Sequence, residues 1–358
     1  MEQHNRERLQ RVGIVVGTAI VTIIVLFAAL AFGLLHGTNS TLPDPSTVTT
    51  PQVIGSGLKF DYIVVIVMEN KDRCPKIIVS CGGSASWMSS LAAGSFAASD
   101  SGELTNDKFT GLHPSLGNYL SLSSGTNFGC QGYDGGPQSN NCTNIAWQGT
   151  SIVNSIVAAG GTWKAYMEDK PTTPTDDCAT GVSDSARYVV RHNPFEYLNS
   201  IRNTPSMCSR VVAAGHNATV LVSDLASTNT ASNFMWLTPN NCHSMHDTGC
   251  GGTDAPGGVP GGDAFLKLVV GQIVNTTVFQ NNRAAVFITF DEDSSSGPTP
   301  QSVYTVWASK ASGIVKDAAS VTSQFNHFSF VATIEQNWAL SPITVATSGA
   351  TPMFEAFD

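Results

Sequence analysis

Two strongly apolar runs, residues 60–68 and residues 284–290, each stop at a group of acidic or amide side chains. The next residues are Glu69 and Asn70 after the first run, and Asp291, Glu292 and Asp293 after the second. Carboxylate and amide oxygens are the ligands that hard divalent cations prefer. A site for a divalent metal ion is therefore expected where the two run ends meet.

Both runs are rich in β-branched and aromatic residues on both faces, which is typical of central strands in a parallel sheet covered by helices. Ligands of such sheets bind beyond the carboxyl ends of the strands. Further strand-like runs are residues 162–167, 218–222 and 234–237, with helical patterns at 151–159 and 263–274 and an irregular Gly/Pro-rich stretch at 249–262. This alternation predicts βαβ units and a mostly parallel sheet.

The segment 110–125 has the pattern of a helix start, because Pro114 and Ser115 precede an apolar stripe. Ser115 is then expected at the N-terminus of the helix, where backbone N–H groups and the helix dipole favour an anion. A serine there could attack a phosphoryl group held by the same amides. An ordinary N-cap serine is the alternative.

Histidines give a second group of candidates. His243, His246 and Asp247 lie close together after a strand-like run and could reach a common centre. Imidazole and carboxylate groups suit several divalent metals, although solvated histidines in a cysteine-containing loop would have the same sequence. His192 and His327 stand alone, and each fits either a ligand or a hydrogen-bonded structural residue.

The composition indicates an exported protein with one catalytic-sized domain. The chain has 358 residues, only 13% of them charged, and a formal net charge of −9. No cluster of Lys and Arg is present, which argues against a nucleic-acid partner because phosphate backbones are held by such clusters. No internal repeat divides the chain.

The N-terminal region predicts a membrane anchor. Residues 12–35 are apolar and uncharged, and they follow three arginines that place residues 1–11 in the cytoplasm. Residues 36–57 are rich in Thr, Ser and Pro and predict a flexible stalk, so that residues 58–358 form an extracytoplasmic domain. A cleaved signal peptide, with a secreted product, is the alternative, but its apolar core would be shorter.

The cysteines support this placement because all eight follow the predicted anchor and lie in close couples. The expected disulfide couples are Cys74 with Cys81, Cys130 with Cys142, Cys178 with Cys208, and Cys242 with Cys250. Spacing alone does not establish this connectivity. The glycosylation sequons begin at Asn39, Asn141, Asn217 and Asn275, again beyond the anchor.

A series of short motifs, spread over residues 60–340, occurs in a fixed order. The motifs are Val-Met-Glu-Asn at 67–70, His-Pro-Ser-Leu-Gly-Asn-Tyr at 113–119, Trp-Lys-Ala-Tyr-Met-Glu-Asp at 163–169, Arg-His-Asn-Pro-Phe at 191–195, Thr-Pro-Asn at 238–240, Met-His-Asp at 245–247, Gly-Asp-Ala-Phe-Leu at 262–266, Phe-Asp-Glu-Asp at 290–293, His-Phe-Ser at 327–329 and Thr-Ile-Glu at 333–335. In this series the chain resembles the phosphoesterase family of secreted acid phosphatases and bacterial phospholipases C.

The resemblance implies an alkaline phosphatase-like, three-layer α/β/α sandwich with a mostly parallel central sheet. It also implies one or two divalent metal ions and a phosphorylated serine or threonine. Carried over to this chain, the catalytic residues are Ser115, Asn70, His192 and His246, the metal ligands are Glu69, Asn70, Ser115, Asp291, Glu292 and His246, and further candidates are His113, Asn118, His243, Asp247 and His327.

Two positions depart from the family pattern. Gly117 stands where a proline is usual, and Ser244 stands where an aspartate is frequent. Together with the predicted anchor at 12–35, the resemblance implies a membrane-tethered, metal-dependent phosphatase that hydrolyses phosphomonoesters of a small molecule or a phospholipid head group through a phosphoserine. The alternatives are a phospholipase C-like phosphodiesterase and a catalytically inactive surface-binding protein.

Overall fold

The computed structural model of the chain describes residues 56–94, 99–109, 113–137, 149–172, 184–295 and 301–358. The predicted cytoplasmic segment 1–11 and the predicted anchor 12–35 lie outside the described residues. The helices within the described ranges are all too short or too polar to cross a membrane. All the described residues belong to one folded unit, Thr50–Asp358.

The described strands form one large sheet and one short ribbon. The large sheet has eight strands in the order β5-β4-β6-β1-β7-β8-β2-β9, and β10 pairs with β3 in the ribbon. All pairs in the large sheet are parallel except those of β8 with β7 and with β2. The strands are β1 (Tyr62–Met68), β2 (Ser99–Leu104), β3 (Asp107–Lys108), β4 (Trp163–Met167), β5 (Val211–Ala213), β6 (Phe234–Thr238), β7 (Ala284–Phe290), β8 (Val306–Lys310), β9 (Ala319–Val321) and β10 (Phe325–Asn326).

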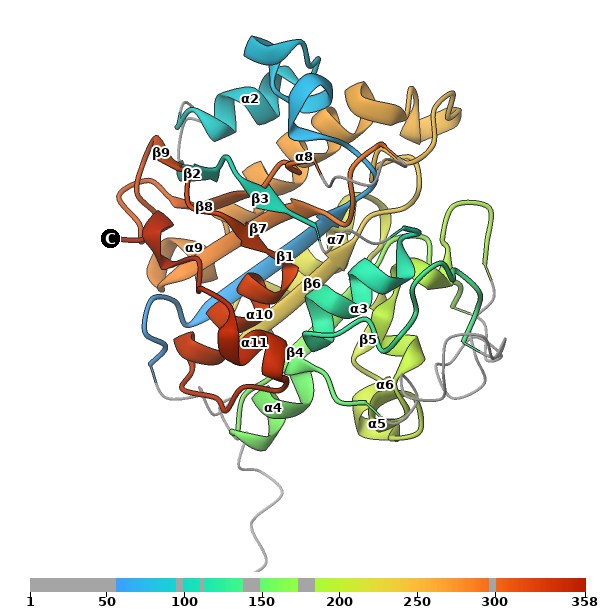
Figure 1. The fold of residues 1–358 in the computed structure, drawn as a ribbon, viewed down its shortest axis with the longest axis vertical. Coiled ribbons are helices and arrows are strands. Elements are labelled where there is room, and N and C mark those ends of the chain that lie inside the picture. Colours follow the sequence, from blue (N-terminus) through green and yellow to red (C-terminus); the bar gives the residue numbers. More distant parts are fainter. Residues whose placement is uncertain (1–55, 95–98, 110–112, 138–148, 173–183, 296–300) are drawn as a thin grey trace, which may run out of the picture. The chain divides into compact units, whose positions relative to one another are not determined.

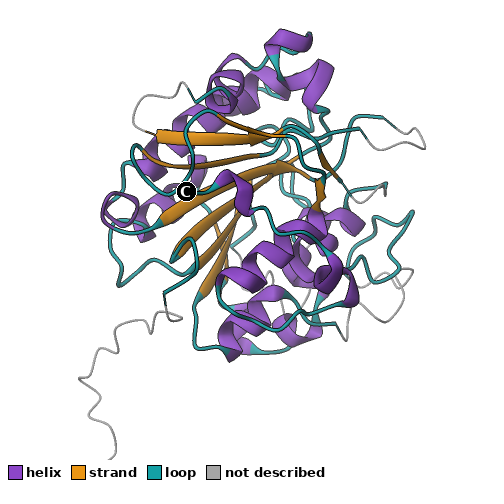
Figure 2. Cartoon of the chain, turned by 60° about the vertical axis from the view of Figure 1, so that its left-hand side comes forward, coloured by secondary structure: helices purple, strands orange, loops and turns teal. Residues whose placement is uncertain are grey.

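Helices cover both faces of this sheet, as Figures 1 and 2 show. The α-helices are α2 (Ser86–Ala92), α3 (Leu116–Ser124), α4 (Ile152–Ala158), α5 (Asn199–Arg202), α6 (Pro205–Cys208), α7 (Thr219–Asp224), α8 (Gly258–Val274), α9 (Thr277–Asn281), α10 (His327–Asn337) and α11 (Val345–Gly349). Short 3-10 turns include η3 (Val190–His192), η4 (Pro194–Tyr197) and η5 (His216–Ala218).

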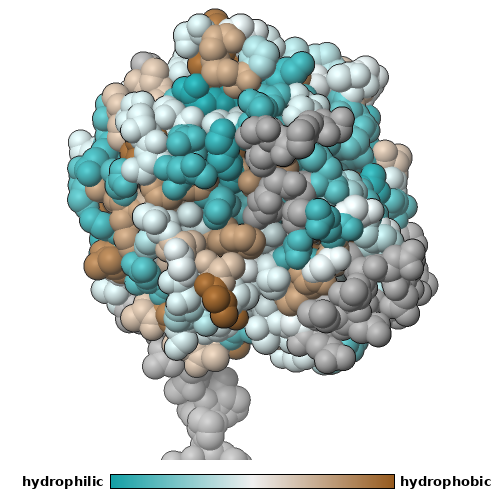
Figure 3. Space-filling view, viewed as in Figure 1, coloured by the Kyte–Doolittle hydropathy of each residue, from teal (hydrophilic) through white to brown (hydrophobic). Residues whose placement is uncertain are grey.

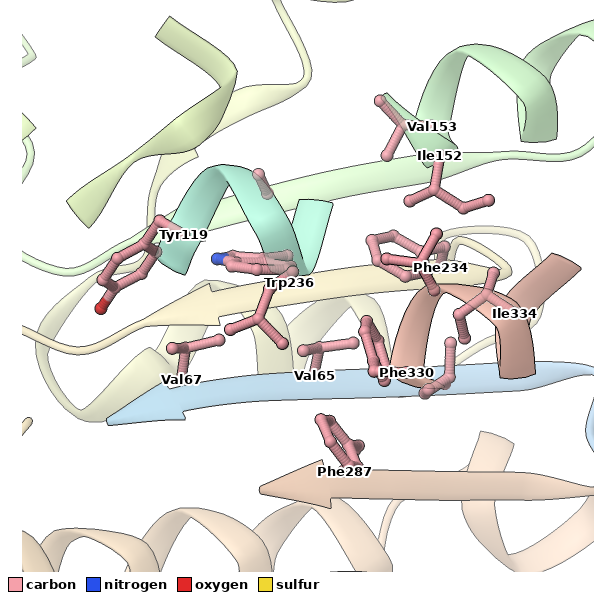
Figure 4. Packing of buried hydrophobic residues seen from close by; sticks show 14 of the residues in the cluster. Val65, Val67, Tyr119, Ile152, Val153, Phe234, Trp236, Phe287, Phe330 and Ile334 are labelled. Carbon is pink, nitrogen blue, oxygen red and sulfur yellow. The ribbon is translucent and has the colours of Figure 1, made fainter. Parts of the chain in front are cut away.

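Strand β1 shows why two helical layers form. All its residues are buried, and successive side chains of a strand point to opposite faces. Val65 and Val67 pack in the core that contains residues of α3, α4 and α10, whereas Val64 and Ile66 pack in the core that contains residues of α2, α8 and α9. Figure 4 shows the first of these cores, with Trp236 of β6 beside α3. The α/β prediction with a mostly parallel sheet is therefore confirmed.

Two details of the sequence prediction are wrong. Residues 218–222 form no strand, because Ala218, Leu221 and Leu225 are buried at helical spacing and the segment belongs to η5 and α7. Residues 249–262 are not irregular throughout, since α8 begins at Gly258. A Cβ at Gly262 would lie 2.3 Å from the Met245 side chain, so glycine lets α8 approach the loop after β6 closely.

The disulfides agree with the predicted couples where the described residues allow a test. Cys74 bonds with Cys81, and Cys242 bonds with Cys250. Cys130 and Cys208 are also disulfide-bonded. Their predicted partners, Cys142 and Cys178, lie outside the described residues, as do Asn39 and Asn141.

The face of the molecule in Figure 3 is mainly polar, with scattered apolar spots.

Candidate active site

The parallel pairing of β1 with β7 brings the two acidic strand ends together. Met68 lies opposite Phe290 in this pairing, so the residues directly after them are neighbours. The Asp291 amide donates to the Met68 carbonyl at 3.0 Å, and the Asn70 amide donates to Asp291 Oδ1 at 3.1 Å. Glu69 and Asp291 are fully buried and Glu292 is nearly so. We call Glu69, Asp291 and Glu292 the acid cluster.

Helix α3 presents its N-terminal turn to the acid cluster. Ser115 immediately precedes the helix, as predicted, and its hydroxyl donates to Glu69 Oε2 at 3.3 Å. One turn later Tyr119 donates to Glu69 Oε1 at 2.6 Å, and Asn118 donates to Glu292 Oε2 at 2.9 Å. Positions three and four apart share a helix face, which explains why this short motif reaches two carboxylates.

His192 lies against the same carboxylate as Tyr119. It belongs to η3, is buried, and stacks on the Tyr119 ring with centroids 5.3 Å apart. Its Nε2 atom lies 3.2 Å from Glu69 Oε1 without forming a well-oriented hydrogen bond. Burial, with the nearby Arg191 charge, lowers the pKa of His192 well below its ordinary value. The imidazole is therefore neutral at neutral pH, as a ligand or a hydrogen-bond acceptor requires.

Two more histidines face the acid cluster from other loops. His113 Nδ1 lies 3.1 Å from Glu292 Oε1. His246 contacts Asp247 Oδ1 through Nδ1 at 2.7 Å, and its ring centre is 5.8 Å from that of His192. The Asp291 carboxyl responds to the charge of His246, which lowers its pKa. Asp247 thus fixes the orientation of His246.

His327 supports the cluster through the backbone. It begins α10, and its Nε2 atom lies 2.6 Å from the Asp291 carbonyl oxygen. Burial lowers the pKa of His327 to about 4, so the neutral ring donates its Nε2 hydrogen to this carbonyl. His327 therefore holds the end of β7 in place, rather than contacting the Asp291 carboxylate.

His243 belongs to a different group of side chains. It bonds with Glu168 Oε2 at 2.8 Å through Nδ1, and its ring stacks on Phe265. Its Nε2 lies 3.6 Å from Asp254 Oδ1, and Asn240 donates to Asp254 at 3.1 Å. The prediction that His243, His246 and Asp247 share one centre is therefore wrong. We call Glu168, Asn240, His243 and Asp254 the Glu168 cluster.

The electrostatics of the acid cluster favour a cation. Burial raises the pKa of Glu69 well above its ordinary value, and the Asp291 charge raises it further. Burial also raises the pKa of Asp291, and burial together with Asp291 raises that of Glu292. Asp291 Oδ2 has no hydrogen-bond partner. Adjacent buried carboxylates repel one another unless a positive charge is shared between them.

This donor set fits a divalent metal ion in its chemistry. In the described residues, no three His, Cys, Asp or Glu side chains already converge as a ligand group. The Asn70 side-chain amide lies against both carboxylates, with its nitrogen placed to donate to Glu69 Oε2 at 2.7 Å and to Asp291 Oδ1 at 3.1 Å, and the Ser115 hydroxyl adds an oxygen beside Glu69. Hard divalent cations accept such mixed oxygen ligands.

The comparison with known proteins identifies the family. The model of the Phosphoesterase family matches residues 85–341 of the chain. The chain belongs to this family. Membership places it among the hydrolases that act on phosphoric ester bonds, as the sequence motifs predicted.

Curated relatives of this phosphoesterase are similar over most of its length. A phosphatidylinositol-3-phosphatase of Mycobacterium tuberculosis is 24% identical over 289 residues, which cover 81% of this chain and 80% of the relative. A phosphate-repressible acid phosphatase of Penicillium chrysogenum is 26% identical over 287 residues, which cover 79% of this chain and only 60% of the relative.

A solved structure has the same fold. A Vibrio parahaemolyticus protein in the alkaline phosphatase superfamily superposes with a TM-score of 0.50 at 11% identity, covering 87% of this chain and 76% of that one. This similarity supports the α/β fold with a mostly parallel sheet that the sequence predicts.

The two departures from the family motifs have backbone roles in this phosphoesterase. The Gly117 carbonyl accepts a hydrogen bond from Ser121 within α3. The Ser244 carbonyl accepts the Glu69 amide at 2.9 Å, which ties the loop after β6 to the end of β1. Ser244 thus lies beside the acid cluster but adds no carboxylate to it.

Sequence reasoning missed two residues of this site. Tyr119 is a member of the apolar stripe after Ser115 and was not named as a candidate, yet its hydroxyl donates to Glu69. Asp134 accepts the Leu116 amide at 3.1 Å, and its charge raises the pKa of Glu69 and Glu292. Its neighbours along the chain give no periodic pattern, so no local signal marks it. The spacing between Ser115 and Tyr119 could have identified Tyr119.

Proposed function

We propose that this protein is a metal-dependent phosphomonoesterase of the acid phosphatase type, with Ser115 as its nucleophile. The observation that carries the proposal is the position of Ser115. Its hydroxyl lies at the N-terminus of α3, 3.3 Å from Glu69 Oε2, within a group of buried carboxylates. A nucleophile at a helix N-terminus is well placed to attack an anionic phosphoryl group.

In this mechanism the side chains position the phosphoryl group and move its protons. Ser115 Oγ attacks phosphorus in line with the leaving ester oxygen, and its proton passes to the neighbouring carboxylates. The ester bond breaks as the bond to Oγ forms. Water then hydrolyses the phosphoserine and releases inorganic phosphate. His113 and His246, which face the acid cluster, would donate to phosphoryl or leaving oxygens.

Glu69, Asn70, Ser115 and Asp291 would hold the divalent metal ion, with Glu292 and His246 beside them. When bound, the ion would lower the pKa of the Ser115 hydroxyl and neutralise negative charge on the phosphoryl oxygens. The buried, mutually repelling carboxylates support this assignment, because a cation offsets their repulsion.

The substrate we propose is a terminal phosphate on a small molecule or a phospholipid head group. The relatives, a phosphatidylinositol-3-phosphatase and an acid phosphatase, support this class. We also propose that residues 12–35 tether the domain on the extracytoplasmic side of the membrane, from their length and apolar composition. The two disulfides within the described residues agree with an oxidising compartment.

The test is hydrolysis of p-nitrophenyl phosphate by residues 58–358, with and without a chelator, for the wild type and Ser115→Ala. We expect chelator-sensitive turnover that the variant loses. Ser124→Ala is the matched control, because that buried α3 hydroxyl contacts the hydroxyl of Ser123, away from the acids. A folded Ser115→Ala protein with a wild-type rate would refute the assignment.

Substrate choice separates the alternatives. Turnover of bis(p-nitrophenyl) phosphate but not of the monoester would favour the phospholipase C-like phosphodiesterase. Absence of turnover on both substrates, with the fold and metal content intact, would favour the inactive binding protein.

A further inference from the structure

Asp134 occupies the position where a substrate anion is expected. Its Oδ1 accepts the backbone N–H of Leu116, the first residue of α3, at 3.1 Å. Leu116 directly follows Ser115, so the amide next to the proposed nucleophile is bonded to a carboxylate of the protein itself. The side chain of Asp134 is 28% exposed, which leaves it open to solvent on one side.

Arg191 holds the other oxygen of this carboxylate. Its Nε lies 2.8 Å from Asp134 Oδ2, and its Nη1 lies 3.4 Å from Asp184 Oδ2. Arg191 directly precedes His192, and its charge lowers the pKa of that histidine. The Arg191 guanidinium therefore lies beside the N-terminus of α3. The Asp134 carboxylate that holds it there resembles part of a phosphate group in charge and size.

The backbone around Asp134 is fixed, so only its side chain needs to move. On one side the Gly132 amide donates to the His113 carbonyl at 3.2 Å. On the other, Tyr197 donates its hydroxyl to the Gly135 carbonyl at 2.7 Å. A rotation of the Asp134 side chain about its own bonds would uncover the Leu116 amide without rearranging the loop.

The carboxylate of Asp134 is also unfavourable for its neighbours. Its negative charge raises the pKa of both Glu69 and Glu292. The buried His192 Nε2 atom in the same site has no hydrogen-bond partner. The protein thus keeps an additional negative group and an unsatisfied polar atom at the place where a phosphoryl group would bind.

We propose that a bound phosphoryl group displaces the Asp134 carboxylate from its two partners, the Leu116 amide and Arg191, an inference that rests on the proposed function. We call this displacement the exchange. The phosphoryl oxygens take the place of the Asp134 carboxylate at the Leu116 amide, and Arg191 transfers its ion pair from Asp134 to the phosphoryl group. Asp134 competes with the substrate and with inorganic phosphate. Arg191 selects terminal phosphates, which present several charged oxygens to a guanidinium.

Two substitutions test the exchange through the affinity for inorganic phosphate. Arg191→Met is expected to weaken phosphate binding by roughly 10- to 100-fold, as for loss of a hydrogen bond to a charged group. Asp134→Asn keeps an oxygen for the Leu116 amide but removes the charge, and it is expected to tighten phosphate binding by at least roughly threefold. Titration calorimetry with inorganic phosphate measures both directly, and inhibition of p-nitrophenyl phosphate hydrolysis by phosphate gives a second value.

The double variant distinguishes exchange from simple charge repulsion. If Asp134 acts by restraining Arg191, the gain in phosphate affinity from Asp134→Asn should be smaller in the Arg191→Met background than in the wild type. An equal gain in both backgrounds would overturn the exchange, as would an unchanged phosphate affinity in either single variant. Thermal melting of each variant confirms that the fold is intact.

A matched ion pair at the opposite edge of the sheet provides the control. Arg283 Nη2 lies 2.6 Å from Asp61 Oδ1, before the first residues of β7 and β1. Arg283→Met and Asp61→Asn are expected to leave phosphate affinity unchanged. A wild-type protein that neither binds phosphate nor hydrolyses the monoester would refute the proposed function and this inference together. An active wild type with unresponsive variants would refute this inference alone.

Discussion

The acid cluster and the Glu168 cluster lie at the same edge of the sheet, but their charges are compensated differently. In the Glu168 cluster, Glu168 accepts hydrogen bonds from the Asn217 and Asn240 amides and from His243. Asp254 pairs with Arg187 and accepts from Asn240. In the acid cluster, Ser115, Tyr119 and Asn118 also donate hydrogen bonds, but the carboxylates stand beside one another and one Asp291 oxygen has no partner.

This difference shows that acids at strand ends serve two purposes in this fold. Donors and a guanidinium satisfy the Glu168 cluster from within the protein, which suits a structural role for the loop after β6. The acid cluster is left with repulsion that a bound cation would relieve. Only the balance of partners distinguishes the two clusters, since both follow buried parallel strands.

Apart from Ser115→Ala, the substitution with the largest expected effect on turnover is Asp291→Asn. Loss of this carboxylate should reduce kcat/KM by roughly 10³-fold, since phosphoryl transfer depends on charge stabilisation. Bound metal, measured by mass spectrometry on the purified protein, should fall as well. A variant with full metal content would contradict the ligand role of Asp291.

Tyr119→Phe should have an intermediate effect on turnover. The change removes the 2.6 Å hydrogen bond to Glu69 and keeps the ring that stacks on His192. Loss of a hydrogen bond to a charged group predicts a roughly 10-fold decrease in kcat/KM. Steady-state kinetics and metal titration would test this, and an unchanged apparent metal affinity together with an unchanged rate would show that Tyr119 does not orient Glu69.

Glu168→Ala should affect stability far more than the turnover of the folded protein. It breaks the buried contact with His243 and leaves two backbone amides without an acceptor. The expected loss is about 3 to 5 kcal/mol in the free energy of unfolding. Urea denaturation would measure it, and metal content should stay at the wild-type level. Loss of metal from the folded variant would show that Glu168 belongs to the active site. The two clusters would then not differ in role.

Asp107→Asn should leave turnover unchanged and alter only the pH dependence of stability. Burial raises the pKa of Asp107 from 3.8 to about 7, against the hydrogen bond from Thr305. The unfolded chain therefore loses this proton at lower pH than the folded protein does. The protonated Asp107 carboxyl therefore stabilises the folded protein fully below pH 3.8, and this stabilisation is lost as the pH rises through about 7.

The measurement for Asp107 is the free energy of unfolding from denaturant titrations between pH 4 and pH 8. The difference between wild type and Asp107→Asn should change in favour of the variant as the pH rises. A difference that does not vary with pH would show that this isolated buried acid does not titrate as described.

Much of the fold could be predicted because it depends on local patterns. The apolar runs that became β1 and β7, and the helix start after Pro114, were identified from residue types alone. The prediction of a strand at 218–222 was wrong. The β-branched residues of this segment favour a strand locally, but the packing of Leu221 and Leu225 selects a helix.

Prediction of the site succeeded where a motif directly follows a regular element. Glu69, Asp291 and Ser115 are all such residues, and they contact one another or share a partner. His243 was grouped with His246 because the two are three residues apart, but the loop turns between them, with Met245 at a φ of 78°. Sequence proximity cannot show which way each side chain leaves such a turn.

The sequence by itself determined which residues end the buried strands and begin α3, because strand and helix boundaries depend on neighbouring residues. Only the tertiary structure decided which acids meet. Pairing of β1 with both β6 and β7 joins segments far apart in the chain, and the placement of Asp134 against Leu116 depends on a loop without periodic pattern. Such contacts arise from packing and from hydrogen bonding between distant segments, which local propensities do not encode.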